Sequence, residues 1–159
     1  MSLRCEATEQ GVLLSAGSME LSVLSALPEF LASIDGSGPE AERLHPPAYR
    51  DDDEAEREFQ RLVGDDLDGL HRADATELAE VTRRLGHGPI ELEVAQAESL
   101  LRAVGTARLA LAARTGLFDL DELPETPSTP QQTLVHFLGV VQESLVGALS
   151  DRLDTPSPS

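Results

Sequence analysis

Leucine limits the fold classes open to this chain more than any other residue, because it is abundant and recurs at helical spacing. The 159 residues include 26 Leu and 10 Val, whereas aromatic residues make up 3% and Trp is absent. Leu is a strong helix former, while strands favour β-branched and aromatic residues. Apolar residues repeated three and four positions apart line one side of a helix. The pattern predicts a mainly α protein, a single-domain bundle of about five helices with a short N-terminal β-hairpin.

Turn and capping residues set the expected ends of these helices. Pro28 lies inside the first apolar repeat and predicts a kink or two short helices, because proline lacks the N–H and clashes one turn back. Gly64 is expected to close the second helix and Asp65 to cap the third. We expect one helical domain over residues 1–154 and a disordered tail at 155–159. Its helices are predicted at about residues 18–34, 51–63, 66–85, 93–115 and 130–152.

The β-hairpin is predicted at residues 3–14, ahead of the first helix. Leu3, Cys5 and Ala7 alternate with polar residues, which is the period of a half-buried strand. Gly11 completes the turn, and the three residues after it provide the return strand. Two strands alone are only marginally stable, so the hairpin is expected to pack on the helices.

The last predicted helix is apolar on nearly all sides between residues 134 and 149. Such a helix is either central in the fold or shared with a partner. Gly139 and Gly147 lie eight residues apart and therefore near one face, where small residues let another helix approach closely. That neighbour is either another helix of the same chain or the same helix of a second subunit. The limited area of five helices favours the second alternative, a homodimer through residues 134–149.

The charge of the chain bears on its partners. Asp and Glu total 29 against 12 cations, all of them Arg, which gives a formal charge of -17. Proteins that bind DNA neutralise phosphates with clustered Lys and Arg, and no window of this sequence is basic. We therefore expect no direct nucleic-acid binding by the chain alone and favour a basic protein partner. The absence of Lys and Asn, whose codons are AT-rich, points to a GC-rich, bacterial genome.

No catalytic, cofactor-binding or metal-binding residues are predicted, and we expect the protein not to be an enzyme. The acidic run at residues 51–54 lacks the alternating acids and the glycine of an EF-hand, and it suits the positive end of a helix dipole instead. The four His are far apart, and GxSxG, GxGxxG and Walker patterns do not occur. One Cys, no signal pattern and no apolar run of roughly 20 residues predict a cytoplasmic protein that does not enter membranes.

Two individual residues invite closer reading. Cys5 is a redox candidate, but a reactive thiol needs exposure and a lowered pKa, and the strand pattern places Cys5 with apolar neighbours. The pattern therefore favours a buried thiol over a sensor.

Arg108 falls in an otherwise apolar helix seam, where a charge needs a partner. Glu143 is the candidate partner for a buried ion pair, and the alternative is that the Arg108 stem extends to solvent.

Three sequence blocks together resemble a known family. They are residues 49–59 continuing to 62–67, residues 107–111 through Gly116, and residues 137–145. Their order and spacing are similar to the actinobacterial family DUF2017, which includes the oxidative-stress regulator AosR and whose genes often neighbour that of the Clp adaptor ClpS. The resemblance covers nearly the whole chain, and the inferred GC-rich genome agrees with it.

The resemblance implies a redox-responsive transcriptional regulator that works with an alternative sigma factor and promotes cysteine-biosynthesis genes. An intrachain disulfide would need two cysteines, and the chain has only Cys5. Either this member uses an intermolecular disulfide or a sulfenic acid at Cys5, or it has lost redox sensing. The alternative function is a constitutive protein-interaction module or an adaptor linked to Clp proteolysis.

Overall fold

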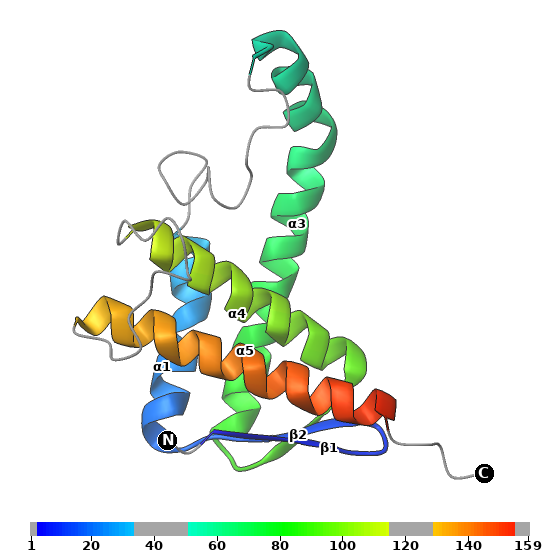
Figure 1. Cartoon of the computed structure of the whole chain (residues 1–159), viewed down its shortest axis with the longest axis vertical. Coiled ribbons are helices and arrows are strands. Elements are labelled where there is room, and N and C mark those ends of the chain that lie inside the picture. Colours follow the sequence, from blue (N-terminus) through cyan, green and yellow to red (C-terminus); the bar gives the residue numbers. More distant parts are fainter. Residues whose placement is uncertain (1–2, 34–50, 115–128, 155–159) are drawn as a thin grey trace.

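A computed structural model describes residues 3–33, 51–114 and 129–154 of the chain (Figure 1). Those residues are mainly helical, with a small antiparallel sheet formed by residues 4–7, 11–15 and 90–93, which confirms the predicted fold class. The tail predicted at 155–159 lies outside the described residues. The elements are β1 (Arg4–Ala7), β2 (Gly11–Ser15), α1 (Ser18–Ala32), α3 (Asp53–Leu85), β3 (Ile90–Glu93), α4 (Val94–Arg114) and α5 (Pro130–Asp154).

The sheet has the order β1-β2-β3, so the predicted hairpin is extended by a third strand. One face is buried: Val12 pairs with Leu92, and both have 0% of their surface exposed. On the other face Glu6 and Glu91 flank Leu13 and are exposed. β3 was not predicted, because four alternating residues become a recognisable strand only when β2 supplies a pairing edge.

Gly11 lets β2 and β3 approach each other closely. A Cβ atom at this position would lie 1.8 Å from the backbone carbonyl oxygen of Leu92 in β3. The Gly11 N–H donates to the Thr8 hydroxyl at 2.9 Å, and the Thr8 N–H donates to the Gly11 carbonyl at 2.9 Å. The turn and the close approach to β3 therefore both depend on this glycine.

α3 is one continuous helix of 33 residues, so the two helices predicted at 51–63 and 66–85 are wrong. Gly64 costs a helix interior only about 1 kcal/mol, which the rest of a long helix can absorb. The cap is Asp52, whose carboxylate accepts the Ala55 N–H at 3.1 Å. Pro28 likewise lies inside α1 without dividing it.

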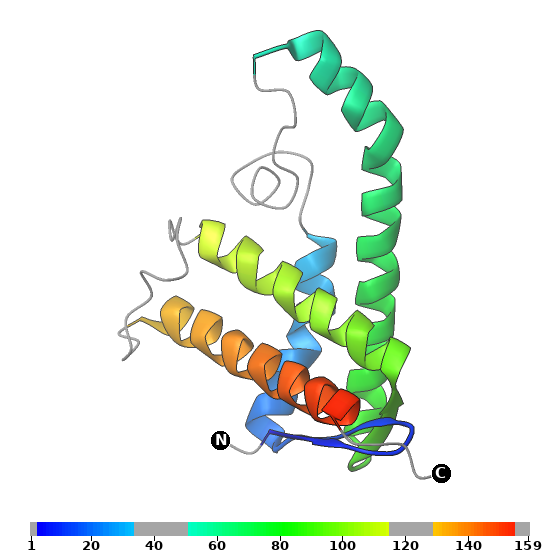
Figure 2. The same cartoon turned by 45° about the vertical axis from the view of Figure 1, so that its right-hand side comes forward.

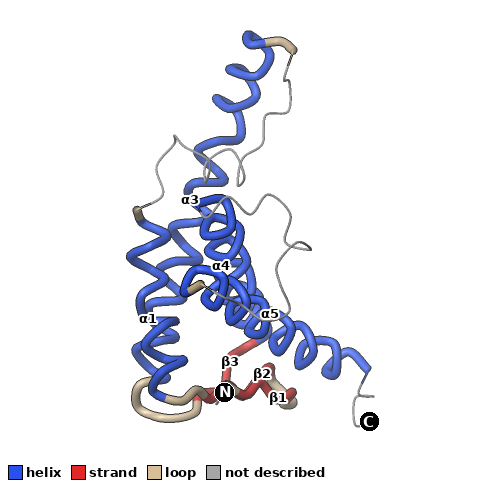
Figure 3. The backbone as a smooth tube through the Cα atoms, turned by 60° about the vertical axis from the view of Figure 1, so that its left-hand side comes forward, coloured by secondary structure: helices blue, strands red, loops and turns tan. Residues whose placement is uncertain are grey.

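The helices and strands pack into one body that includes the C-terminal half of α3, and the N-terminal half of α3 projects from it. Figures 1 and 2 show α4 and α5 crossing in front of α1 and the lower half of α3, with the strands beneath them. Figure 3 shows the upper half of α3 extending past the ends of the other labelled helices. The largest fully buried side chains come from every described helix and from β2 and β3. They are Leu14, Leu24, Leu78, Leu92, Leu100, Leu138 and Leu145, with Val12, Val81, Val104, Val135 and Val141.

α5 covers α4 and the hairpin with one side and leaves the other side open. Its buried positions include Val135 and Leu138, whereas His136, Glu143 and Val146 are exposed. Within the described residues, one helical segment, 130–152, is long and apolar enough to span a membrane by length and composition, with a mean hydropathy of 1.3. The side chains it buries belong to the protein core.

The C-terminal end of α5 is fastened to the hairpin turn. Arg152 donates from Nε to the Thr8 carbonyl at 3.1 Å and from Nη2 to the Glu9 carbonyl at 2.6 Å. Hydrogen bonds from a charged donor are stronger than neutral ones. The last described helix therefore stabilises the turn of the first hairpin.

Candidate functional site

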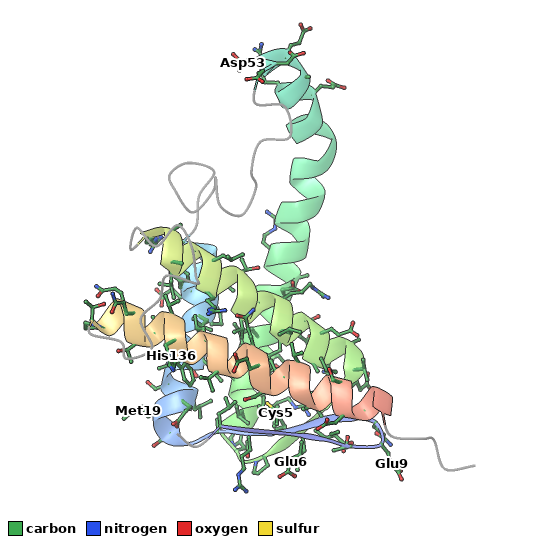
Figure 4. All side chains as sticks on the ribbon, viewed as in Figure 1. Cys5, Glu6, Glu9, Met19, Asp53 and His136 are labelled. Atoms are coloured by element: carbon green, nitrogen blue, oxygen red, sulfur yellow. The ribbon has the colours of Figure 1, made fainter. Side chains whose placement is uncertain are left out.

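Cys5 lies on the inner face of the sheet, as the strand pattern predicted. It pairs with Leu14 across β1 and β2 and packs, half-buried, against the hydrophobic core. Figure 4 shows Cys5 on the side of the hairpin nearer to α5, while the neighbouring Glu6 points the other way. Burial disfavours the charged thiolate and raises the pKa of the Cys5 thiol from 9.0 to about 11. The residue named as a redox candidate thus has little of the reactive form near neutral pH.

We expect a thiol reagent at pH 8 to label native Cys5 roughly 100-fold more slowly than the denatured protein, because the raised pKa of the buried thiol leaves about a hundredfold less thiolate. The protonated thiol also favours the folded state. That contribution is present below pH 9.0 and is lost as the pH rises toward about 11. Labelling kinetics of the native and the denatured protein, measured from pH 7 to 10, test the expected difference in rate, with Cys5→Ser as the blank. Equal native and denatured rates would contradict the inward position of Cys5.

Arg108 joins α4 to α5, but not through the predicted partner. Its Nη1 donates to Gln142 Oε1 at 3.1 Å, and its Nε is buried without a hydrogen-bond partner among the described residues. Glu143 is exposed, so the predicted Arg108–Glu143 pair is not formed. Adjacent residues on a helix differ by about 100° in direction, and Gln142 is the one that faces α4.

Two glycines make room for this polar seam between α4 and α5. A Cβ atom at Gly139 would lie 2.9 Å from Arg108 Nη2, and one at Gly105 would lie 3.0 Å from Gln142 Nε2. Each helix therefore receives a polar side chain of the other at a glycine. Of the two neighbours predicted for Gly139, the structure shows the one within the chain. Gly147 has nothing within 4 Å of its Cβ position, so a homodimer through residues 134–149 stays a prediction that would use the open side of α5.

An ion pair that was not predicted connects α3 to α4. Asp74 is 4% exposed and accepts two hydrogen bonds at 3.1 Å from Arg102, which also donates to the Ser99 hydroxyl at 3.1 Å. The hydrogen bonds to Asp74 raise the pKa of Arg102 further above its usual value. Asp74 falls at a seam position between apolar residues, and an acid at such a position is the signal that could have indicated a buried partner.

Several arginines are engaged by the chain itself. Besides Arg102 and Arg108, Arg152 binds the hairpin turn and Arg114 lies over the Phe30 ring at 4.7 Å from its centroid. By contrast, the acids at 51–54 and the outward acids of β3 are exposed. These four arginines make contacts within the chain, whereas Arg4, Arg57, Arg72 and Arg83 are exposed.

The acidic run at 51–54 spans the start of α3, which begins at Asp53 and has Asp52 as its cap. In the part of the chain that the structure describes, no group of three or more His, Cys, Asp or Glu could hold a metal ion.

Comparison with known proteins finds a match over residues 4–149 to the family described as "Domain of unknown function (DUF2017)". No curated protein and no solved structure matches the chain.

Proposed function

Because the chain belongs to the DUF2017 family, we propose that it is a non-enzymatic transcriptional regulator of the oxidative-stress response that contacts an alternative sigma factor. This function is carried over from the resemblance to the family of AosR, and with it we expect the protein to lie in the cytoplasm of an actinobacterium. The observation that supports it best is the distribution of charge. The chain carries a formal charge of -17, and three of its twelve arginines are engaged by Asp74, Gln142 and the hairpin turn.

This distribution favours a protein partner over DNA. Affinity for duplex DNA comes largely from cations that neutralise phosphates and release counterions. A surface dominated by acids repels DNA and steers toward cationic protein surfaces, at rates that fall as salt rises. A regulator of this kind influences promoters through the polymerase subunit that it binds.

The second candidate is a constitutive interaction module or an adaptor linked to Clp proteolysis. The position of Cys5 favours it, since a half-buried thiol with a pKa of about 11 forms sulfenic acid slowly. The two candidates differ in partner and in their response to peroxide.

A pull-down from native lysate with and without peroxide tests both candidates, using the wild-type chain and Cys5→Ser as matched baits. We expect the bait to retain a sigma factor, and the purified sigma factor to bind again. Peroxide should change the retained amount less than about twofold, because the Cys5 thiolate is scarce. Gel shifts with promoter DNA at physiological salt should show no complex without the sigma factor.

Other outcomes separate the alternatives. Retention of Clp components without a sigma factor would replace the first candidate by the second. A peroxide response that is present in the wild type and lost in Cys5→Ser would establish Cys5 as a sensor. A sequence-specific DNA complex at submicromolar protein would contradict the proposal of action through protein contact.

A further inference from the structure

The small sheet ends in two edge strands. β2 lies in the middle, so β1 and β3 each have one side that pairs with no strand among the described residues (Figure 3). An edge strand offers backbone N–H and C=O groups to any other strand, and natural proteins protect such edges with charged side chains, proline, bulges or a covering element. The two edges of this sheet differ in how they are protected.

The edge of β3 is protected against a second copy. Glu91 and Glu93 are exposed on this strand, so two copies of β3 side by side would bring acids together. The Glu93 N–H donates to Gln96 Oε1 at 3.1 Å, which occupies a backbone donor that does not face β2. Pairing at this edge would have to replace that hydrogen bond.

The edge of β1 has backbone groups that point outward. The Thr8 N–H donates to the Gly11 carbonyl at 2.9 Å, and hydrogen-bonded and non-bonded pairs alternate from there along an antiparallel ladder. Counted from this pair, Cys5 and Ala7 occupy positions whose N–H and C=O groups point away from β2. Ala7 is exposed, and the Arg152 hydrogen bonds lie at the turn, beyond these positions. Another strand could therefore bond to this part of the edge.

The charges of β1 favour one occupant. Arg4 and Glu6 are exposed, carry opposite charges and flank Cys5. When two copies of β1 pair antiparallel about Cys5, Arg4 of each copy lies opposite Glu6 of the other. Opposite charges at directly opposed positions stabilise a strand pair, and like charges destabilise it. The edge of β1 is thus complementary to itself.

The same charges disfavour the neighbouring registers. The outward backbone groups of Cys5 and Ala7 stay paired only if one strand shifts by two residues. A shift in one direction places the two copies of Arg4 opposite each other, and a shift in the other direction does the same for Glu6. The formal charge of -17 on each copy also opposes association, but it is screened beyond roughly 8 Å at physiological salt. Directly opposed side chains lie closer than that.

We propose that the outer edge of β1 is an interface with a second copy of this chain, which adds its own β1 antiparallel and joins the two sheets into one. This interface is separate from the open side of α5 and does not depend on the proposed function.

Sedimentation equilibrium of the full chain at physiological salt tests the association. We expect the wild type to dimerise at high micromolar concentration, since a strand of four residues gives a small interface. Arg4→Glu and Glu6→Arg should each raise the dimer dissociation constant roughly tenfold, because both opposed pairs become like-charged. An equimolar mixture of the two variants should associate as tightly as the wild type, because each altered strand is complementary to the other.

Amide hydrogen exchange tests whether the association uses this edge. The N–H groups of Cys5 and Ala7 should exchange more slowly as the wild-type concentration rises, and the Glu6 N–H, which faces β2, is the internal control. Ala7→Pro removes one outward donor and should prevent dimerisation. Proline is tolerated at edge positions of this kind, and circular dichroism checks that the variant is folded.

A wild-type monomer at high micromolar concentration overturns the inference, as does a mixture of the two charge variants that associates no more tightly than either alone. Stronger association of Glu6→Arg than of the wild type would reduce the effect to net charge and also overturn it. The same holds for a folded Ala7→Pro that dimerises like the wild type. Val146 is 48% exposed on α5. If Val146→Glu abolishes the dimer while both charge variants leave it intact, the interface is the open side of α5 and the edge of β1 is wrong.

Discussion

Gly11→Ala is expected to lower the free energy of unfolding by about 3 kcal/mol or more, the upper part of the range for overpacking. The new Cβ would lie 1.8 Å from the carbonyl oxygen and 2.9 Å from the carbonyl carbon of Leu92. Both atoms belong to the backbone of β3, so no side chain can rotate away and β2 must separate from β3. For a chain of this size the melting temperature should fall by roughly 6–12 °C. Urea denaturation followed by circular dichroism measures the change.

Gly147→Ala is the matched control for this substitution. Its Cβ position has nothing within 4 Å, and it lies in the interior of α5. Alanine at an unobstructed helix position should raise stability by roughly 0.5–1 kcal/mol. Equal stabilities of the two variants would show that the β2–β3 contact is looser than described.

Leu138→Ala is the second substitution with a large expected effect. Leu138 is 0% exposed on the side of α5 that joins the core. Truncating a buried Leu removes transfer free energy and leaves a cavity, which costs about 2–5 kcal/mol. Val146→Ala on the same helix is the control, because Val146 is 48% exposed, and it should change stability by less than about 0.5 kcal/mol. A similar loss in both variants would mean that the open side of α5 is covered in solution.

Much of this fold could be predicted from helical periodicity. The helices found at 18–32, 94–114 and 130–154 lie within a few residues of the expected ranges, because their apolar repeats are long and glycine or proline marks their ends. The continuity of α3 could not be predicted, since Gly64 and Asp65 are suitable for ending a helix but do not require it. β3 was missed because its pairing edge on β2 is far away in sequence.

The candidate site residues likewise differ in whether the sequence alone could predict their contacts. The inward position of Cys5 follows from strand alternation, which is a local property. The partner of Arg108 depends on how α4 and α5 cross, and that crossing places Gln142 rather than Glu143 beside it. The pair between Asp74 and Arg102 joins residues 28 positions apart, so its acid could be recognised in the sequence but its partner could not.

The hydrogen bonds between Arg152 and the hairpin turn have a consequence for the order of folding. They join residues 144 and 143 positions apart, and α5 also packs on β1. During synthesis at 5–20 residues per second, the hairpin would wait on the order of ten seconds for the helix that completes it. Contacts of such long sequence separation form late and slow the folding of small proteins. The N-terminal strands are thus the part of this chain most exposed to unproductive pairing or to a chaperone while the rest is still being made.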